Sequence, residues 1–318
     1  MIWATGDCHG NFERFRPEYF PEQAQMTKDD VVVITGDFGG IWFGDARDDE
    51  ALGCLESLPF TLAFVDGNHE NYDALATYPA EEWCGGKVHR IRPHVLHLMR
   101  GQIYELEGYR FFTMGGAKSH DIEDGILEPD APNFERKLLM LQRRPRARYR
   151  INHISWWAQE LPSDEEYAEA RHSLDSVGWE VDYIITHCAP TSIALMGSRH
   201  NEADRLTDFL QEVRERAKYH YWLFGHYHDM SAARPVRATA AVTMTAASPR
   251  PPAMSRSTCR GSRAYPSRPP SSSGIAAARA AWRRPSSRCT WQAFPCAGWR
   301  TSPRHCGAAR SRPPPSAS

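Results

Sequence analysis

The sequence predicts an α/β fold followed by a C-terminal segment of a different kind. Short apolar runs rich in β-branched residues recur through residues 1–234, and several end in a cluster of Gly, Asp, Asn or His. Stretches of helical periodicity lie between some of these runs, and the composition changes abruptly near Pro235. Strands that alternate with helices are typical of α/β architecture, in which ligand groups gather at the carboxyl ends of the strands.

The predicted strands are continuous apolar runs without polar alternation. This pattern is typical of strands that are buried on both faces. The runs cover residues 2–5, 31–35, 61–65, 110–114, 183–186 and 221–224.

Two helices have clear sequence signals. Ser163 and Glu166 form a capping box that opens a helix running to about Val177, where Gly178 ends it. Asn201 is predicted to open a second helix. One face of this helix is apolar and contains Leu206, Phe209, Leu210 and Val213.

Two further segments are assigned by pattern. Apolar runs flank Arg100-Gly101 within residues 95–106, which predicts a β-hairpin. Residues 143–150 contain five arginines, and we interpret this segment as a solvated helix end or loop in preference to a nucleic-acid site.

The C-terminal segment, residues 235–318, is predicted to be a disordered or weakly structured tail. It contains 14 Arg but no Asp, Glu, Lys, Asn or Leu, so it lacks the apolar content that offsets the entropy of ordering a chain. One interpretation is an Arg-rich arm that binds nucleic acid through phosphate contacts. The other is a frameshift near positions 231–238, which the Ala/Arg/Pro/Ser bias favours.

The composition of the whole chain excludes collagen-like, transmembrane and disulfide-scaffold proteins. Hydrophobic residues make up 41% and charged residues 24% of the 318 residues, and no apolar run approaches the roughly 18 residues of a membrane span. Residues 1–234 hold all 39 acidic residues. The chain contains no Cys-x-x-Cys pair, and the N-terminus has no basic segment followed by an apolar stretch. We therefore expect a cytoplasmic protein without a membrane partner; the sequence leaves its oligomeric state undetermined.

Polar clusters rich in Gly, Asp, Asn and His follow five of the predicted strands. Oxygen and imidazole ligands that recur at strand ends can converge on one sheet edge and hold divalent metal ions. The adjacent glycines permit sharp turns and close backbone approach. The clusters are Gly6-Asp7-Cys8-His9-Gly10, Gly36-Asp37-Phe38-Gly39-Gly40, Gly67-Asn68-His69-Glu70, Thr186-His187 and Gly225-His226-Tyr227-His228.

With these five motifs, residues 1–230 resemble the calcineurin-like metallophosphoesterase superfamily. The resemblance implies a two-sheet β-sandwich flanked by helices, with a site for two divalent metal ions of Mn, Fe or Zn type at the carboxyl edge of the strands. It also implies hydrolysis of a phosphomonoester or phosphodiester by a metal-bridging hydroxide.

The resemblance also implies a role for each matching residue. One metal would be held by Asp7, His9 and His228, and the other by Asn68, His187 and His226. Asp37 would bridge both ions. His69 would be the catalytic histidine that stabilises the transition state or protonates the leaving oxygen.

The second motif departs from the phosphoprotein phosphatase branch, which the first and third motifs resemble. That branch has an Asp that orients the catalytic His and a phosphate-binding Arg, where this chain has Gly40 and Ile41. The departure favours a phosphorylated small molecule or nucleotide as substrate over a phosphoprotein. Candidates for the missing phosphate contact are Lys118, His120 and an arginine of residues 143–150.

Several alternatives stay open at this stage. The enzyme can be a nuclease or cyclic-nucleotide phosphodiesterase using the same metals, or the chain can be a nucleic-acid-binding protein acting through its Arg-rich tail. Residues 115–121 form either a substrate loop or a simple glycine turn. Trp156-Trp157 either stacks a base or sugar or, as we favour, packs in the core or a lid.

Overall fold

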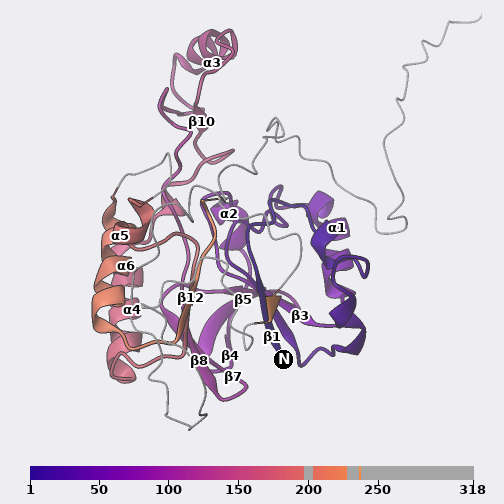
Figure 1. The fold of residues 1–318 in the computed structure, drawn as a ribbon. Coiled ribbons are helices and arrows are strands. Elements are labelled where there is room, and N and C mark those ends of the chain that lie inside the picture. The colour runs from indigo at the N-terminus through magenta and orange to yellow at the C-terminus, as the bar shows by residue number, and fades with distance from the viewer. Residues whose placement is uncertain (197–202, 228–235, 238–318) are drawn as a thin grey trace, which may run out of the picture.

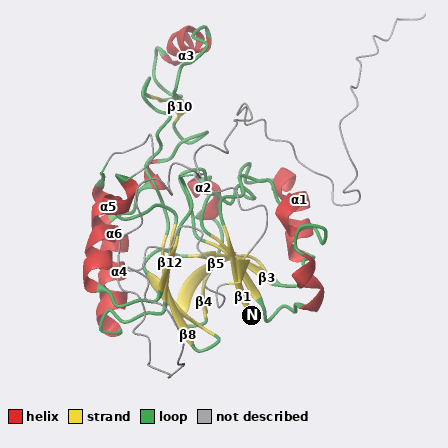
Figure 2. Cartoon of the chain, in the orientation of Figure 1, coloured by secondary structure: helices red, strands yellow, loops and turns green. Residues whose placement is uncertain are grey.

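The computed structural model describes residues 1–196, 203–227 and 236–237, and it has the expected two-sheet architecture. Two β-sheets face each other, and helices cover their outer faces (Figures 1 and 2). α1 covers one side, and α4, α5 and α6 cover the other. The sequence-based prediction of a sandwich flanked by helices is therefore confirmed.

The larger sheet has seven strands in the order β13-β1-β2-β3-β6-β5-β4. β1, β2, β3 and β6 run parallel to their neighbours in this series, whereas β13, β5 and β4 pair antiparallel. The strands are β1 (Ile2–Thr5), β2 (Val31–Ile34), β3 (Thr61–Phe64), β4 (Ala80–Trp83), β5 (Gly86–Arg92), β6 (Val95–Leu98) and β13 (Val236–Arg237).

The smaller sheet has four strands in the order β12-β11-β8-β7. β8, β11 and β12 are parallel, and β7 pairs antiparallel with β8. All of the apolar runs predicted to be strands fall in one of the two sheets. The strands are β7 (Gln102–Leu106), β8 (Tyr109–Met114), β11 (Tyr183–Thr186) and β12 (Tyr221–Leu223).

The central strands are apolar throughout because both of their faces are buried. In β2, Val31 and Val33 pack between the two sheets, whereas Val32 and Ile34 pack in the cluster on the outer face. β8 behaves alike, with Phe111 between the sheets and Phe112 in the cluster that includes residues of α4 and α6. The protein thus has three apolar layers, one between the sheets and one on the outer face of each sheet. These layers fix the positions of the strand ends that carry the polar clusters.

α4 and α6 begin where a capping side chain accepts from free backbone N–H groups. α4 starts at the predicted capping box of Ser163 and Glu166. α6 begins at Arg205, capped by Asp204, so the predicted start at Asn201, which lies outside the described residues, is not the helix start. The α-helices are α1 (Ala46–Glu56), α2 (Tyr72–Leu75), α3 (Phe134–Gln142), α4 (Asp164–Ser176), α5 (Thr191–Ala194) and α6 (Arg205–Arg216).

The predicted hairpin at residues 95–106 is wrong, because β6 and β7 lie in different sheets. Arg100 and Gly101 carry the chain from one sheet to the other. Gly101 has a φ of +71°, and a Cβ there would lie 2.8 Å from the backbone of Ala170 in α4. The tight approach to α4 and the burial of Arg100 turn the chain across the sandwich instead of back along the same sheet.

Residues 121–156 form an arm that projects from the sandwich beyond the strand ends and contains β9 (Ile126–Leu127), α3 and β10 (Arg150–Ile151) (Figure 1). β9 and β10 pair in parallel. Ion pairs join Arg144 to Asp124 and Arg148 to Glu123. The basic segment 143–150 is therefore an exposed helix end and loop of this arm, as predicted, apart from Arg150, whose side chain is 16% exposed.

Of the predicted tail, the structure describes only Val236–Arg237, which form β13 against β1. The rest of residues 235–318 lies outside the described residues, so the boundary of the domain at residue 234 stays a prediction. Within the described part of the chain, no helix combines the length and the apolar character needed to cross a membrane.

A buried ion pair ties the two sheets together beneath the strand ends. Asp66 follows β3 and accepts from Arg100 Nε at 2.8 Å and from Tyr72 Oη at 2.9 Å. Arg100 also donates to Gln159 O and pairs with Glu166 at the start of α4. Burial opposes the charge of Asp66, but Arg100, together with His97, outweighs this effect and holds the pKa of the carboxyl well below its usual range.

Replacing Arg100 by Met should lower the free energy of unfolding by about 3–5 kcal/mol, because the buried Asp66 carboxylate would lose its guanidinium partner. Urea denaturation of the full-length protein measures the change. Arg148→Met breaks an exposed ion pair of the arm and should cost no more than about 1 kcal/mol. Equal effects of the two substitutions would contradict a stabilising role for the buried pair.

Candidate metal centre

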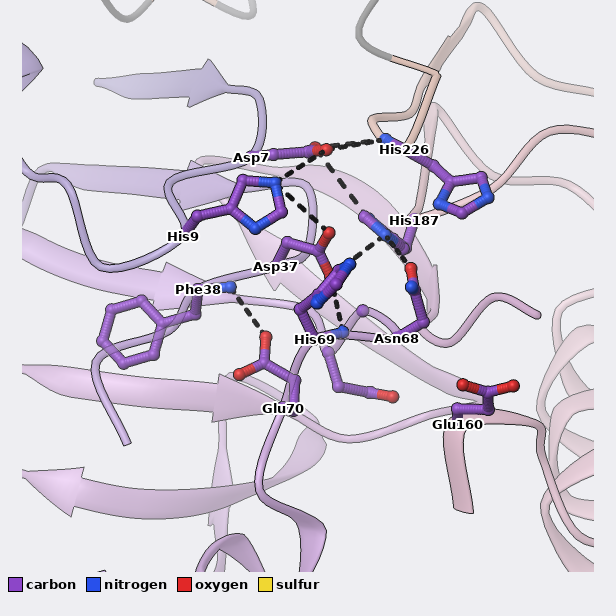
Figure 3. Close-up of polar contacts among 12 residues, drawn as sticks. Asp7, His9, Asp37, Phe38, Asn68, His69, Glu70, Glu160, His187 and His226 are labelled. Atoms are coloured by element: carbon purple, nitrogen blue, oxygen red, sulfur yellow. Dashed lines mark hydrogen bonds and ion pairs between the residues drawn. The ribbon is translucent and has the colours of Figure 1, made fainter. Parts of the chain in front are cut away.

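The polar clusters meet at one edge of the sandwich because parallel strands of both sheets end there. In Figure 3 the side chains from these loops gather around a common centre, with the ring of His226 at the margin. The strand ends that deliver them are those of β1 for Asp7 and His9, β2 for Asp37, β3 for Asn68 and His69, β11 for His187 and β12 for His226.

One group of donors consists of Asp7, His9 and Asp37. One donor atom from each lies within 4.8 Å of the others. His9 Nε2 is 3.5 Å from Asp37 Oδ2 and 4.0 Å from Asp7 Oδ2. Two carboxylates and an imidazole at this spacing are a donor set suited to a divalent metal ion.

A second group of donors lies on the other side of Asp37. His187 Nε2 is 3.3 Å from Asp37 Oδ1 and 3.2 Å from Asn68 Oδ1. Asp37 thus presents Oδ2 to the first group and Oδ1 to the second. This is the position that a carboxylate shared by two cations requires.

His226 lies at the margin of the second group. Its ring centroid is 5.0 Å from that of His187, and its backbone N–H donates to the Asp7 carboxylate at 3.0 Å. Its Nε2 lies 2.8 Å from His120 Nε2. His228, the remaining ligand implied by the sequence, lies outside the described residues.

The backbone conformation at the site suits glycine-rich loops. His9, Asp37 and His226 have φ values of 48°, 49° and 70°, in the left-handed region that non-glycine residues seldom adopt. Gly67 makes room for its neighbour, since a Cβ there would lie 2.1 Å from Asp37 Oδ1. The glycines of the motifs therefore let the loops approach closely enough for the donor atoms to converge.

Hydrogen bonds behind the donors fix their orientation. His187 Nδ1 donates to Thr35 O at 2.8 Å, which directs Nε2 toward Asp37. Asn68 Nδ2 donates to Ser119 Oγ at 3.3 Å, and Ser119 donates to Glu160. Asn68 therefore turns its carbonyl oxygen to the centre.

The loop at 115–121 has a recognisable sequence pattern, whereas Glu160 belongs to no motif and could not be found from the sequence. Its side chain is buried, and burial raises the pKa of its carboxyl. The contact of Ser119 with Asn68 supports the interpretation of this loop as part of the site and not as a simple glycine turn.

Electrostatics show that the donor set attracts positive charge. Burial opposes ionisation of both Asp37 and His187, yet their mutual attraction lowers the pKa of Asp37 and, with Asp7, raises the pKa of His187 to about 10. In the absence of a metal ion, a proton on His187 balances the buried carboxylates. Divalent cations fit this chemistry, since they would replace that proton with a stronger counter-charge.

His69 lies between the donors and the arm. Its backbone N–H donates to Asp37 Oδ1 at 2.9 Å, and its ring Nδ1 lies 3.4 Å from Arg150 Nη2. Arg150 belongs to β10 and pairs with Asp121. Among the three candidates for a phosphate contact, Arg150 and His120 reach the site, whereas Lys118 acts electrostatically on Asp204.

Neither Gly40 nor Ile41 supplies the carboxylate or the guanidinium that the phosphoprotein phosphatase branch has at these positions. A Cβ on Gly40 would lie 2.5 Å from the Phe38 ring, and the side chain of Ile41 is buried in the core of the larger sheet. Glu70 secures this loop, because its carboxylate accepts from the backbone N–H of Phe38 at 2.7 Å. The loop shapes the site but offers no phosphate-binding side chain there.

Two other features of the sequence have structural roles. Cys8 is buried, and burial raises the pKa of its thiol to about 12, so the thiol stays protonated. Trp157 is 2% exposed, packs edge-on against Trp42 and donates from Nε1 to Asp73. Its burial supports core packing over stacking on a base or sugar.

Comparison with known proteins agrees with this geometry. The family model of the calcineurin-like phosphoesterases matches residues 1–230 of the chain. No curated protein matches the chain. The matched range contains every donor described above.

Metal binding should release a proton from His187, because an imidazole ligates a metal only in its neutral form and its pKa is raised to about 10 in the metal-free protein. The apparent affinity should therefore rise with pH between 7 and 9, by about tenfold per unit for each proton released. Calorimetric titration of the full-length protein with Zn²⁺, in buffers of different ionisation enthalpy, counts the protons.

His187→Asn should weaken binding and reduce the number of protons released by one. His172→Asn replaces an exposed histidine of α4 and should leave both unchanged. Binding heats that do not depend on the buffer would contradict the displacement of a proton.

Proposed function

Since the chain belongs to the calcineurin-like phosphoesterase family, whose activity is metal-dependent hydrolysis of phosphoesters, we propose that it cleaves a phosphorylated small molecule or nucleotide at a two-metal centre. The observation that carries this proposal is the position of Asp37, which presents one carboxylate oxygen to each donor group. We propose a cytoplasmic location as well, on the sequence alone.

Each of the two donor groups would hold one of the two metal ions. Asp7 and His9, with His228, would hold one ion, and Asn68, His187 and His226 would hold the other, with Asp37 between them. The ions would be of Mn, Fe or Zn type. When bound, they would act as Lewis acids on the phosphoryl oxygens and acidify the attacking water.

The chain's own residues supply orientation and a proton. Thr35 and Ser119 hold the imidazole of His187 and the amide of Asn68 with their donor atoms toward the centre. His69 is the proposed proton donor to the leaving oxygen. Burial lowers the pKa of its imidazole, against the opposing attraction of Asp37.

The surroundings of the donors support the proposed substrate class. Gly40 and Ile41 provide neither the carboxylate nor the guanidinium expected in a phosphoprotein phosphatase. The arm rises beside the site and brings Arg150 and Asp121 to it. A small phosphorylated compound fits these surroundings better than a folded phosphoprotein.

The full-length protein loaded with Mn²⁺ should hydrolyse p-nitrophenyl phosphate. His69→Ala should lower kcat by about 10²–10⁴-fold, the usual contribution of a general acid. Asp37→Asn should lose at least as much, because it removes charge from the shared position. Steady-state assays on the two variants and the wild type measure these losses.

Two surface variants serve as controls: Asp29→Asn and His172→Ala change exposed residues of the same types and should retain wild-type rates. Parallel assays with bis-p-nitrophenyl phosphate distinguish the monoester from the diester. Faster cleavage of the diester would favour a nuclease or cyclic-nucleotide phosphodiesterase. Wild-type activity in Asp37→Asn would contradict the two-metal centre.

A further inference from the structure

We propose that His120 is a positioning residue of the metal centre, which holds the imidazole of His226 in the orientation that binds the second ion. The second ion is the one assigned to Asn68, His187 and His226. The inference rests on the proposed function for the presence of that ion, and it deepens it by assigning a role to the loop of residues 115–121. His120 belongs to none of the five motifs.

His120 and His226 are in direct contact. Nε2 of His120 lies 2.8 Å from Nε2 of His226, and the two ring centroids are 4.8 Å apart. The distance between the nitrogens is that of a hydrogen bond. His120 therefore engages Nε2 of His226, and Nδ1 is the ring nitrogen that remains to ligate an ion.

The ligand His187 is held by a comparable contact on its other ring nitrogen. Nδ1 of His187 donates to Thr35 O at 2.8 Å, and Nε2 lies 3.3 Å from Asp37 Oδ1. Histidines that bind metals usually have their second ring nitrogen fixed by a partner, which sets the orientation of the ring. Thr35 is this partner for His187, and we assign the same role to His120 for His226.

The residue before His120 holds another proposed ligand of the second ion. Ser119 Oγ accepts from Asn68 Nδ2 at 3.3 Å, and Asn68 Oδ1 lies 3.2 Å from His187 Nε2. Asn68 follows β3 of the larger sheet, whereas His226 follows β12 of the smaller sheet. Two adjacent residues of one loop thus contact ligands that come from different sheets.

The loop is anchored on both sides of His120. Ala117 N donates to Glu160 O at 3.1 Å, and Ser119 donates to the Glu160 carboxylate through its backbone N–H at 3.0 Å and through Oγ at 2.5 Å. On the other side, Asp121 pairs with Arg150 of the arm. A histidine between these anchors has a fixed backbone from which to orient another ring.

The proposal has a consequence that differs between the two ions. Ser119 and His120 contact Asn68 and His226, which are both assigned to the second ion. The donors of the first ion come from the loops that follow β1 and β2. Loss of the His120 side chain should therefore weaken the binding of one ion and leave the other unchanged.

Calorimetric titration of the metal-free, full-length protein with Mn²⁺ measures both affinities. The wild type should show two binding steps. His120→Ala should weaken one step by about 10–100-fold, the usual effect of removing the partner of a metal-binding histidine. His120→Gln retains a polar group able to reach His226 and should recover part of the loss. His172→Ala, which changes an exposed histidine of α4, should bind like the wild type.

A double substitution tests whether His120 acts through His226. In a protein that already carries His226→Ala, adding His120→Ala should have no further effect on the affinity for Mn²⁺. Additive losses would show that His120 affects the centre by another route and would overturn the proposal. Unchanged Mn²⁺ affinity in His120→Ala would overturn it as well, and a raised KM for p-nitrophenyl phosphate would then assign His120 to the substrate.

A crystal structure of the Mn²⁺-loaded wild type decides the question even if the variants fail to fold. The expected result is an ion on Nδ1 of His226, with Nε2 of the same ring facing His120. An ion on Nε2 of His226, or one ion on the Nε2 atoms of both histidines, would overturn the positioning role.

The outcomes separate this inference from the proposed function. The expected loss of Mn²⁺ affinity in a protein that cleaves neither p-nitrophenyl phosphate nor bis-p-nitrophenyl phosphate would support the role of His120 and count against the proposed hydrolysis. A wild-type protein that binds a single ion would overturn both.

Discussion

The site depends on one buried carboxylate, that of Asp37, held where two sets of donors meet. Its side chain is 1% exposed, and its backbone adopts a left-handed conformation. Gly67 leaves room for it, since a Cβ there would lie 2.5 Å from Asp37 N. Burying such a charge is costly unless compensating charge lies beside it. The imidazoles of His187 and His9 supply that compensation in the metal-free protein, and divalent cations would supply it more strongly. The surrounding loops place these imidazoles beside the Asp37 carboxylate.

The remaining architecture keeps these loops at one edge of the sandwich. Parallel strands in both sheets end there, and the buried pair of Asp66 and Arg100 ties the loop after β3 to the crossing between the sheets. The same loop carries Asn68 and His69 only a few residues later. The arm adds Arg150 from the outside, so His69 is approached by the core on one side and by the arm on the other.

Much of this organisation could be predicted from the sequence because it is local. Continuous apolar runs identified β2 and β11, and Ser163 with Glu166 marked the start of α4. The turn at Arg100-Gly101 resembled a hairpin, however, since the sheet to which a strand belongs is decided by tertiary packing. The contact of Arg150 with His69 spans 81 residues of sequence, and no pattern in either segment distinguishes Arg150 from its neighbouring arginines.

The most direct test of the central claim is anomalous X-ray scattering from crystals of the full-length protein loaded with Mn²⁺. The account predicts two anomalous peaks about 3.5–4 Å apart, with one carboxylate oxygen of Asp37 on each. One peak beside Asp7 and His9 with none beside Asn68 and His187, or two peaks that Asp37 does not join, would contradict a shared carboxylate as the basis of the site.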